Sequence, residues 1–212
     1  HAQQAEGALA DEVERSLANA LVHMGGLLDM LRECGDADGS TRPLSPEGLH
    51  RTSLLAQLRV LLAYCKRKGA LVLGEQEGRP LSTEALGLMA AELGADLRAA
   101  GVPCLCMTNL ERPVSAPVAS ALFDCLHACA MACAARSEAS ALFVIGEAPT
   151  GAAIEVRVSL EMSEEGRARS QAFDPDELAR SLRQAAPCVL SAEVTSEDDS
   201  LNAIILLERR LP

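Results

Sequence analysis

Two segments near the start of the chain carry apolar residues at the spacing of long helices, and this pattern most constrains the fold. Between residues 6 and 34, Leu, Val, Ala and Met recur every three or four positions, as on the apolar stripe of a bundle helix. A second segment begins with Ser45 as N-cap and Pro46 in the first turn, and extends to about Val72. The chain is therefore predicted to start with two long helices.

The polar stretch Cys34–Ser40 predicts the loop between these helices, with Gly35 just after the end of the first helix. Two long helices joined by a short loop form an antiparallel hairpin. Such a hairpin cannot cover its own apolar stripes, so we expect a homodimer in which two copies form a four-helix bundle.

Gly74–Pro80 is the expected domain boundary, which gives a hairpin domain over residues 1–74 and a second domain over residues 80–212. Ser82 predicts a helix start, and Asp174-Pro175 predicts another. The remaining pattern predicts helices over residues 82–100, 113–136 and 175–186, and strands over residues 102–109, 141–145, 153–160, 189–194 and 201–207. This order predicts an α+β fold, a two-layer sandwich with helices on one side of a mixed sheet.

The composition excludes several classes of function. The net charge is −11, and such an acidic surface repels nucleic acid and anionic lipid, so we expect neither as a partner. No stretch reaches 18 consecutive apolar residues, and no secretory signal is visible, which predicts a cytoplasmic location. The chain begins His1-Ala2 without Met, so we expect any membrane-anchored sensor region to lie upstream of it.

The eight cysteines do not form a disulfide pattern. Cys125, Cys129 and Cys133 recur every four residues, while Cys104 and Cys106 share one face of a predicted strand. Structural zinc sites usually draw on Cys pairs in loops, so the helix and strand placement favours reduced, buried thiols and no metal site.

The predicted order resembles the cytoplasmic region of bacterial sensor histidine kinases, in which a dimerising hairpin precedes an ATP-binding α/β sandwich. Glu14-Arg15 followed by His23 resembles the opening of the phosphoacceptor helix. Residues 58–69 resemble the second hairpin helix of kinase-like proteins from Gram-positive bacteria, and residues 122–128 stand where such kinases have their N-box. The resemblance implies that His23 accepts the phosphoryl group and that a response-regulator receiver domain is a partner. The alternative for His23 is an ordinary histidine on a helix.

The sequence also departs from this family. Met24 follows His23, where the family has an acidic residue. The N-box Glu and Asn correspond to Asp124 and Ala128, so the amide that holds Mg²⁺ is missing. No Asp-x-Gly-x-Gly follows residues 141–145, where residues 146–151 stand instead, and the lid-like loop over residues 161–169 has one glycine, Gly166.

These departures predict a degenerate nucleotide site and no cofactor, with Mg-ATP bound only if the site still functions, because phosphoryl transfer relies on Mg²⁺ and positioned donors. The expected function is the transmitter region of a two-component histidine kinase, with kinase activity left open. The alternative is an inactive pseudokinase that serves as a dimeric interaction module for a regulator.

Three further features have ordinary interpretations. Lys66-Arg67-Lys68 is expected to stabilise the negative end of a helix, or else to dock an acidic partner such as a receiver domain. His127 is expected to be a core or surface residue, and His50 to be solvated.

Overall fold

The computed structural model describes residues 2–36, 46–136, 139–162, 174–197 and 200–209. Its helices are α1 (Ala2–Asp36), α2 (Pro46–Gln76), α3 (Thr83–Ala99), α4 (Ala116–Ala134) and α6 (Pro175–Ala185). Its strands are β1 (Cys104–Asn109), β2 (Ala139–Glu147), β3 (Ala153–Met162), β4 (Val189–Ser196) and β5 (Ser200–Glu208). This order confirms the predicted α+β fold.

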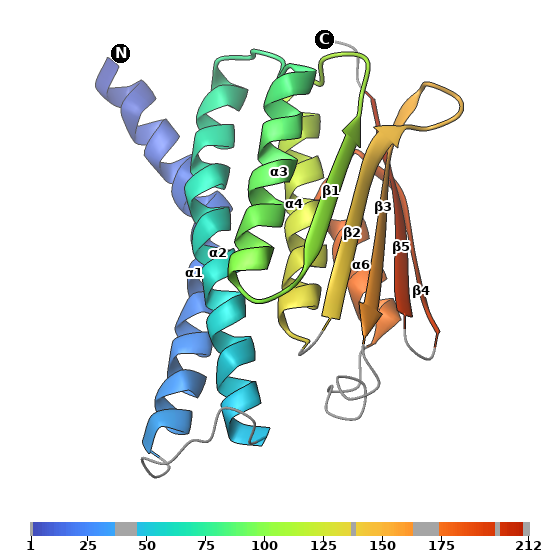
Figure 1. Cartoon of the computed structure of the whole chain (residues 1–212). Coiled ribbons are helices and arrows are strands. Elements are labelled where there is room, and N and C mark those ends of the chain that lie inside the picture. Colours follow the sequence, from blue (N-terminus) through green and yellow to red (C-terminus); the bar gives the residue numbers. More distant parts are fainter. Residues whose placement is uncertain (1, 37–45, 137–138, 163–173, 198–199, 210–212) are drawn as a thin grey trace.

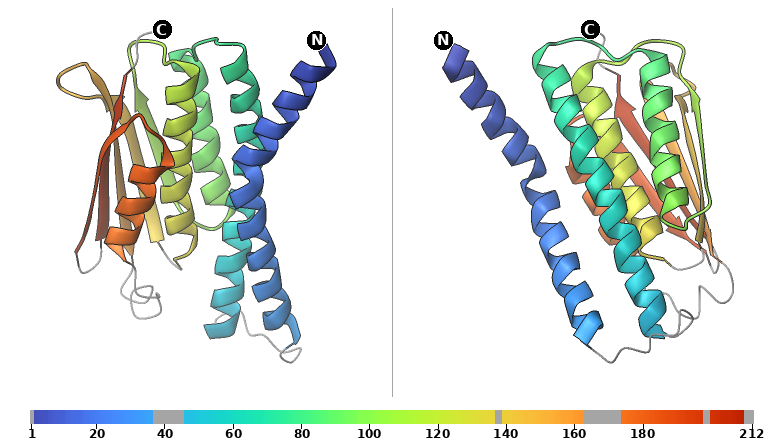
Figure 2. Two further views of the ribbon diagram at one scale, coloured as in Figure 1. Left: turned by 180° about the vertical axis from the view of Figure 1, so that it is seen from behind. Right: turned by 60° about the vertical axis from the view of Figure 1, so that its left-hand side comes forward.

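The first two helices run antiparallel to each other, as the predicted hairpin requires (Figure 1). Toward its N-terminus α1 leans away from the rest of the molecule, while α2 lies against α4 along much of its length (Figure 2). The hairpin has a small core of its own, made by Ala20, Leu27, Leu54, Leu58 and Leu61. However, α2 also contributes Ala56 and Val60 to the main core, so the hairpin and the sandwich are packed together.

The sheet has the strand order β1-β2-β3-β5-β4, in which β1 and β2 are parallel and the other neighbours are antiparallel. Helices α3, α4 and α6 cover one face of it (Figure 2). The alternation of β3 is confirmed, since Ile154, Val156, Val158 and Leu160 are buried between sheet and helices. The opposite face carries exposed apolar side chains, namely Leu105, Met107, Leu142, Leu190 and Ile204.

Helix α4 is the central helix of the core. It is long and apolar enough to cross a membrane by length and composition, but most of it is buried inside the protein. Phe123 has no exposed surface, and Cys125, Cys129 and Cys133 are at most 2% exposed, as predicted for thiols that pack like small apolar side chains. Aromatic residues make up only 2% of the chain. The core is therefore built mainly from Leu, Ala, Val and Cys.

Several element boundaries differ from the predictions. Helix α1 continues through Gly35 to Asp36, and α2 continues past Val72 to Gln76. Helix α4 begins at Ala116 rather than near 113, because Val114 instead forms a β-bridge with Leu81. The predicted N-caps of the later helices are confirmed: the Ser82 hydroxyl accepts a hydrogen bond from the Ala85 amide, and the Asp174 carboxylate accepts from the first turn of α6. Ser45 lies outside the described residues.

Candidate functional site between hairpin and sandwich

A cavity of about 840 Å³ opens where the hairpin meets the helical face of the sandwich. Four helices supply its lining: α1, α2, α4 and α6. The side chains with polar groups around it are Asn19, His23, Tyr64, Lys68, Asp124, His127, Glu177, Arg180, Ser181 and Gln184. Sites of this size between packed helices are typical binding sites for small molecules or reacting groups.

A polar network joins α2 to α4 at the wall of this cavity. The Lys68 ammonium lies 2.8 Å from an Asp124 carboxylate oxygen and donates to the Ser120 hydroxyl at 2.6 Å. The other Asp124 oxygen accepts a hydrogen bond of 2.9 Å from the Tyr64 hydroxyl. Lys68 is only 7% exposed, so its charge depends on this carboxylate for stabilisation. The network therefore fixes the hairpin to the sandwich and occupies both oxygens of Asp124.

An aromatic stack lies beside the network. The ring of Tyr64 stacks on the ring of His127, with centroids 3.9 Å apart, and on the ring of Phe123, with centroids 5.5 Å apart. Burial, followed by the negative charge of Asp124, raises the pKa of Tyr64 well above its usual range. Burial, with a smaller contribution from the charge of nearby His23, lowers the pKa of His127 to about 3. His127 is therefore neutral at physiological pH, and its half-buried place between helices lies between the predicted core and surface positions.

One ring nitrogen of His127 has an unusual environment. Its Nδ1 atom is buried and has no hydrogen-bond partner among the described residues. A buried nitrogen without a partner is unfavourable by about 1–3 kcal/mol. This position is therefore stabilised by stacking rather than by polar contacts.

His23 lies on α1, and its side chain is exposed while it also lines the cavity. Met24 after it is half-buried against the hairpin core, and Gly25 and Gly26 leave the next turn of the helix bare. An exposed imidazole at a cavity mouth can approach both solvent and a reactant. His50, by contrast, is exposed on α2 and does not line the cavity, as its predicted solvation requires.

Asp124 and Ala128, the two positions compared with the N-box in the sequence analysis, both line the same cavity as His23. The fold thus brings together residues that lie about a hundred positions apart in the sequence. Ala128 provides no donor or acceptor for a metal, and Asp124 is neutralised by Lys68. No group of three or more potential ligands is arranged to hold a metal ion in the part of the chain that the structure describes.

The prediction that Lys66, Arg67 and Lys68 stabilise the end of a helix is wrong, and docking of an acidic partner stays a prediction for the exposed Lys66. They do not lie at a helix end, because α2 continues to Gln76. Arg67 binds α3, donating to Glu92 at 2.7 Å and to Asp96 at 2.5 Å, and Lys68 is buried against α4. A lysine at helical spacing from Tyr64 was the available sequence signal for this site, since both then face the same way.

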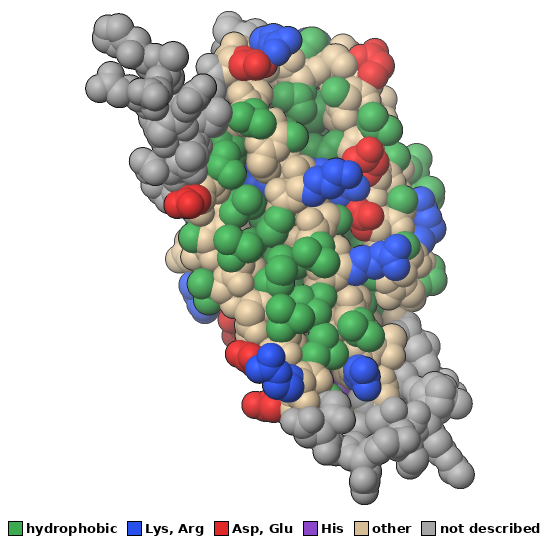
Figure 3. Space-filling view, turned by 90° about the vertical axis from the view of Figure 1, so that its left-hand side faces the viewer, with side chains coloured by type: hydrophobic (Ala, Val, Ile, Leu, Met, Phe, Trp, Pro, Cys, Tyr) green, Lys and Arg blue, Asp and Glu red, His purple; other side chains and the backbone are tan. Residues whose placement is uncertain are grey.

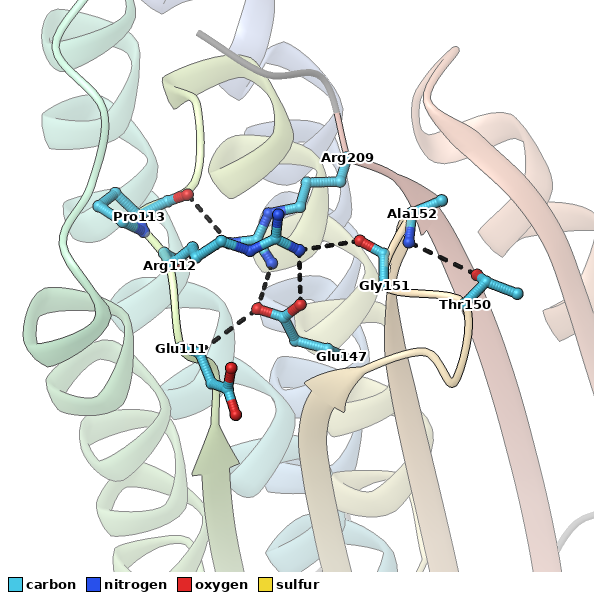
Figure 4. A network of polar contacts seen from close by, with 8 residues as sticks. All are labelled: Glu111, Arg112, Pro113, Glu147, Thr150, Gly151, Ala152 and Arg209. Atoms are coloured by element: carbon cyan, nitrogen blue, oxygen red, sulfur yellow. Dashed lines mark hydrogen bonds and ion pairs between the residues drawn. The ribbon is translucent and has the colours of Figure 1, made fainter.

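Residues 146–151, which stand where the glycine-rich motif was expected, comprise the last two residues of β2 and most of the turn that leads to β3. Glu147 there accepts from Arg112 at 2.7 Å and from Arg209 at 2.6 Å (Figure 4). The hydrogen bond from Arg112 contributes most to lowering the pKa of Glu147, to about 2. The turn lies at the upper end of the sheet in Figure 1, and it does not line the cavity. Gly166 lies outside the described residues.

No family model matches the chain, and no curated protein matches it. Solved structures do match. The histidine kinase domain of the Erythrobacter litoralis EL346 blue-light activated histidine kinase is 15% identical, with 94% of each chain covered and a TM-score of 0.47. The Acinetobacter baumannii histidine kinase AdeS is 12% identical, covering 92% of this chain and 98% of that one, with a TM-score of 0.44.

A third match is the histidine kinase ThkA in complex with the response regulator protein TrrA. It is 12% identical, with 96% of this chain and 62% of that chain covered and a TM-score of 0.40. All three similarities are distant in sequence and in structure.

Proposed function

We propose that the chain is a dimeric phosphotransfer module of the histidine-kinase type, in which His23 carries the phosphoryl group and the sandwich does not hold Mg-ATP. The observation that carries this proposal is the pairing of Lys68 with Asp124 in the cavity that His23 lines. The partner would be a receiver domain of a response regulator.

The loss of nucleotide chemistry follows from charge and from donor groups. A metal ion bound beside the triphosphate would need oxygen ligands from α4. Ala128 has none, and the carboxylate of Asp124 is shared between the Lys68 ammonium and the Tyr64 hydroxyl. A Mg²⁺ ion at Asp124 would have to displace a buried lysine, which would then lose its counter-charge.

The phosphoacceptor role rests on the accessibility of His23. A neutral imidazole nitrogen of His23 attacks the phosphorus of an aspartyl phosphate on the receiver domain. The P–N bond forms as the P–O bond to the carboxylate breaks, the aspartate leaves as a carboxylate, and the imidazole proton goes to solvent. This reaction needs an exposed histidine and no bound nucleotide, and His23 is exposed.

The dimer is supported by a second apolar stripe on the hairpin. Ala20 and Leu27 of α1 are buried against α2, yet the next residues, Leu21 and Leu28, are 55% and 53% exposed. In α2, too, each buried residue is followed by an exposed one: Leu54 and Leu61 are buried, while Leu55 and Leu62 are 52% and 57% exposed. The exposed pairs are each seven residues apart, the spacing of a coiled-coil seam.

Figure 3 views the molecule from the hairpin side and shows hydrophobic side chains gathered along its middle. Contiguous apolar surface of this kind usually marks an interface. A second copy of the same hairpin would bury both stripes and complete the four-helix bundle.

The test of the proposed function uses a receiver domain that is phosphorylated with a labelled small-molecule phosphodonor. We expect label to move to the chain without ATP, to be acid-labile as a phosphohistidine is, and to disappear in His23→Ala. The matched control is His50→Ala, which alters another exposed histidine of the hairpin and should keep the label.

The alternative function, a pseudokinase that only binds its regulator, has a distinct outcome in this experiment. In that case the receiver domain would bind, but neither the wild-type chain nor His50→Ala would acquire label. Label taken directly from Mg-ATP would instead identify an active kinase and contradict the proposal for the sandwich.

A further inference from the structure

Two cysteines of β1 meet outside the cavity already described. Cys104 and Cys106 are two residues apart on the same face of the strand, and their sulfur atoms are 3.8 Å apart. β1 lies at the edge of the described sheet, where β2 is its neighbour. Cys106 is half-buried, whereas Cys125, Cys129 and Cys133 are at most 2% exposed. Solvent therefore reaches this pair through Cys106, while Cys104 is buried.

Helix α3 packs closely on this pair at Gly94. A Cβ atom on Gly94 would lie 3.0 Å from the sulfur of Cys106 and 3.8 Å from that of Cys104. Any other residue at this position would therefore press on the thiols. Gly94 has helical φ, so its lack of a side chain serves close packing over the sulfurs and not a turn.

The surroundings also favour a thiolate at one of the two sulfurs. The guanidinium of Arg98 lies beside the pair, donating to the carbonyl of Cys104 at 2.6 Å. The hydrogen bond from Cys104 and, against the opposing effect of burial, the positive charge of Arg98 lower the pKa of Cys106, while the same hydrogen bond and burial raise the pKa of Cys104. Thiolate is the form that binds metals and electrophiles. Arg98 thus prepares one sulfur for such a reaction, and the second sulfur is within reach.

We propose that Cys104 and Cys106 form a two-sulfur binding site for a soft, thiophilic centre of the Cu(I) or trivalent-arsenic class. Bonds of about 2.3 Å from a central atom to two sulfurs, the length of a zinc–thiolate bond, span 3.8 Å at an angle near 110°. Soft thiolate ligands select such centres over Mg²⁺ or Ca²⁺. Two sulfurs suffice for this class, which fits a site that has no third potential ligand arranged with it among the described residues.

With an organic arsenical the reaction is a condensation. Phenylarsine oxide and two thiols give a cyclic dithioarsenite and one water. Two S–H bonds and the arsenic–oxygen double bond break, two As–S bonds form, and the oxide oxygen leaves as water. Arsenic stays trivalent, so no oxidant or reductant is needed.

The probe is one equivalent of phenylarsine oxide added to the full chain, followed by native mass spectrometry. We expect a single adduct with loss of one water, which disappears in Cys104→Ala and in Cys106→Ala. Cys65→Ala is the matched control, because Cys65 is a half-buried thiol on another element and should leave the adduct unchanged. An adduct that persists in Cys106→Ala, or no adduct with the wild-type chain, would overturn the proposal.

Two further measurements keep the result interpretable. The melting temperature of each variant shows that it is folded, and a rise in the wild-type melting temperature with one equivalent of the arsenical supports binding to the native state. Competition for Cu(I) against a chromogenic chelator distinguishes the two possible occupants, a metal ion and an arsenical. Cu(I) uptake that needs both cysteines supports a metal ion as the occupant, and its absence assigns the site to arsenicals.

Discussion

Removal of the Asp124 carboxylate should destabilise the protein strongly, because it leaves Lys68 buried without a counter-charge. The side chains of Lys68 and Asp124 are 9% and 21% exposed, and the charged atoms are 2.8 Å apart. At an effective dielectric constant near 20 the attraction at this distance is about 6 kcal/mol. Desolvation offsets part of it, so we expect Asp124→Ala to lower the free energy of unfolding by about 3 kcal/mol.

The assay is urea denaturation followed by circular dichroism, with the melting temperature as a second readout. For a chain of this size, a loss of 3 kcal/mol corresponds to a fall of about 6–12 °C. The matched control is Arg79→Ala, which breaks the exposed pair of Arg79 and Glu77, whose side chains are 77% and 54% exposed. It should change stability by less than about 0.5 kcal/mol.

A double variant separates the ion pair from lost packing. Lys68→Met combined with Asp124→Leu removes both charges and keeps apolar volume, so it should be more stable than Asp124→Ala alone. An Asp124→Ala protein within about 1 kcal/mol of wild type would refute the reasoning, since Lys68 would then have found solvent or another partner.

Three other expectations concern packing, pH and assembly. Gly94→Ala should destabilise by about 1 kcal/mol in thermal unfolding, because its Cβ would crowd Cys106, while Gly87→Ala in the same helix has open space and should stabilise. The folded protein holds the pKa of Glu147 below its ordinary value of 4.5, so this carboxylate stabilises the protein above about pH 4.5, and the stabilisation is lost as the pH falls toward 2. In Glu147→Gln, the free energy of unfolding measured with urea should therefore depend less on pH between about pH 5 and pH 2. An unchanged pH dependence would contradict this assignment. Leu55→Glu with Leu62→Glu should turn a dimer into a folded monomer in sedimentation at micromolar concentration, whereas a monomeric wild type would contradict the bundle.

The architecture was predictable because it depends on periodicity. The stripes of α1 and α2, the alternation of β3 and the N-caps Ser82 and Asp174 are local signals, and each is confirmed. Element ends were less predictable, since Gly35 could continue a helix as readily as end it, and Val114 left its predicted helix to pair with Leu81. The ends of helices and strands depend on tertiary contacts, which the intrinsic propensities of the residues do not include.

The site could be predicted only in part. His23 and Asp124 were singled out by their resemblance to two separate motifs of a known family, but their convergence on one cavity needed the packing of the helices. Lys68 was misinterpreted because a basic triplet looks like a surface patch, and only the fold turns one of its residues inward. The dimer, the phosphoacceptor role and the response-regulator partner stay predictions, and so does the absence of bound Mg-ATP.

The central claim is that His23 exchanges a phosphoryl group in a protein whose sandwich does not supply one. The most direct measurement follows label from a phosphorylated receiver domain and, in parallel, from Mg-ATP. The account predicts label from the receiver domain alone, lost in His23→Ala and kept in His50→Ala. Label that comes from Mg-ATP, or that remains in His23→Ala, would contradict it.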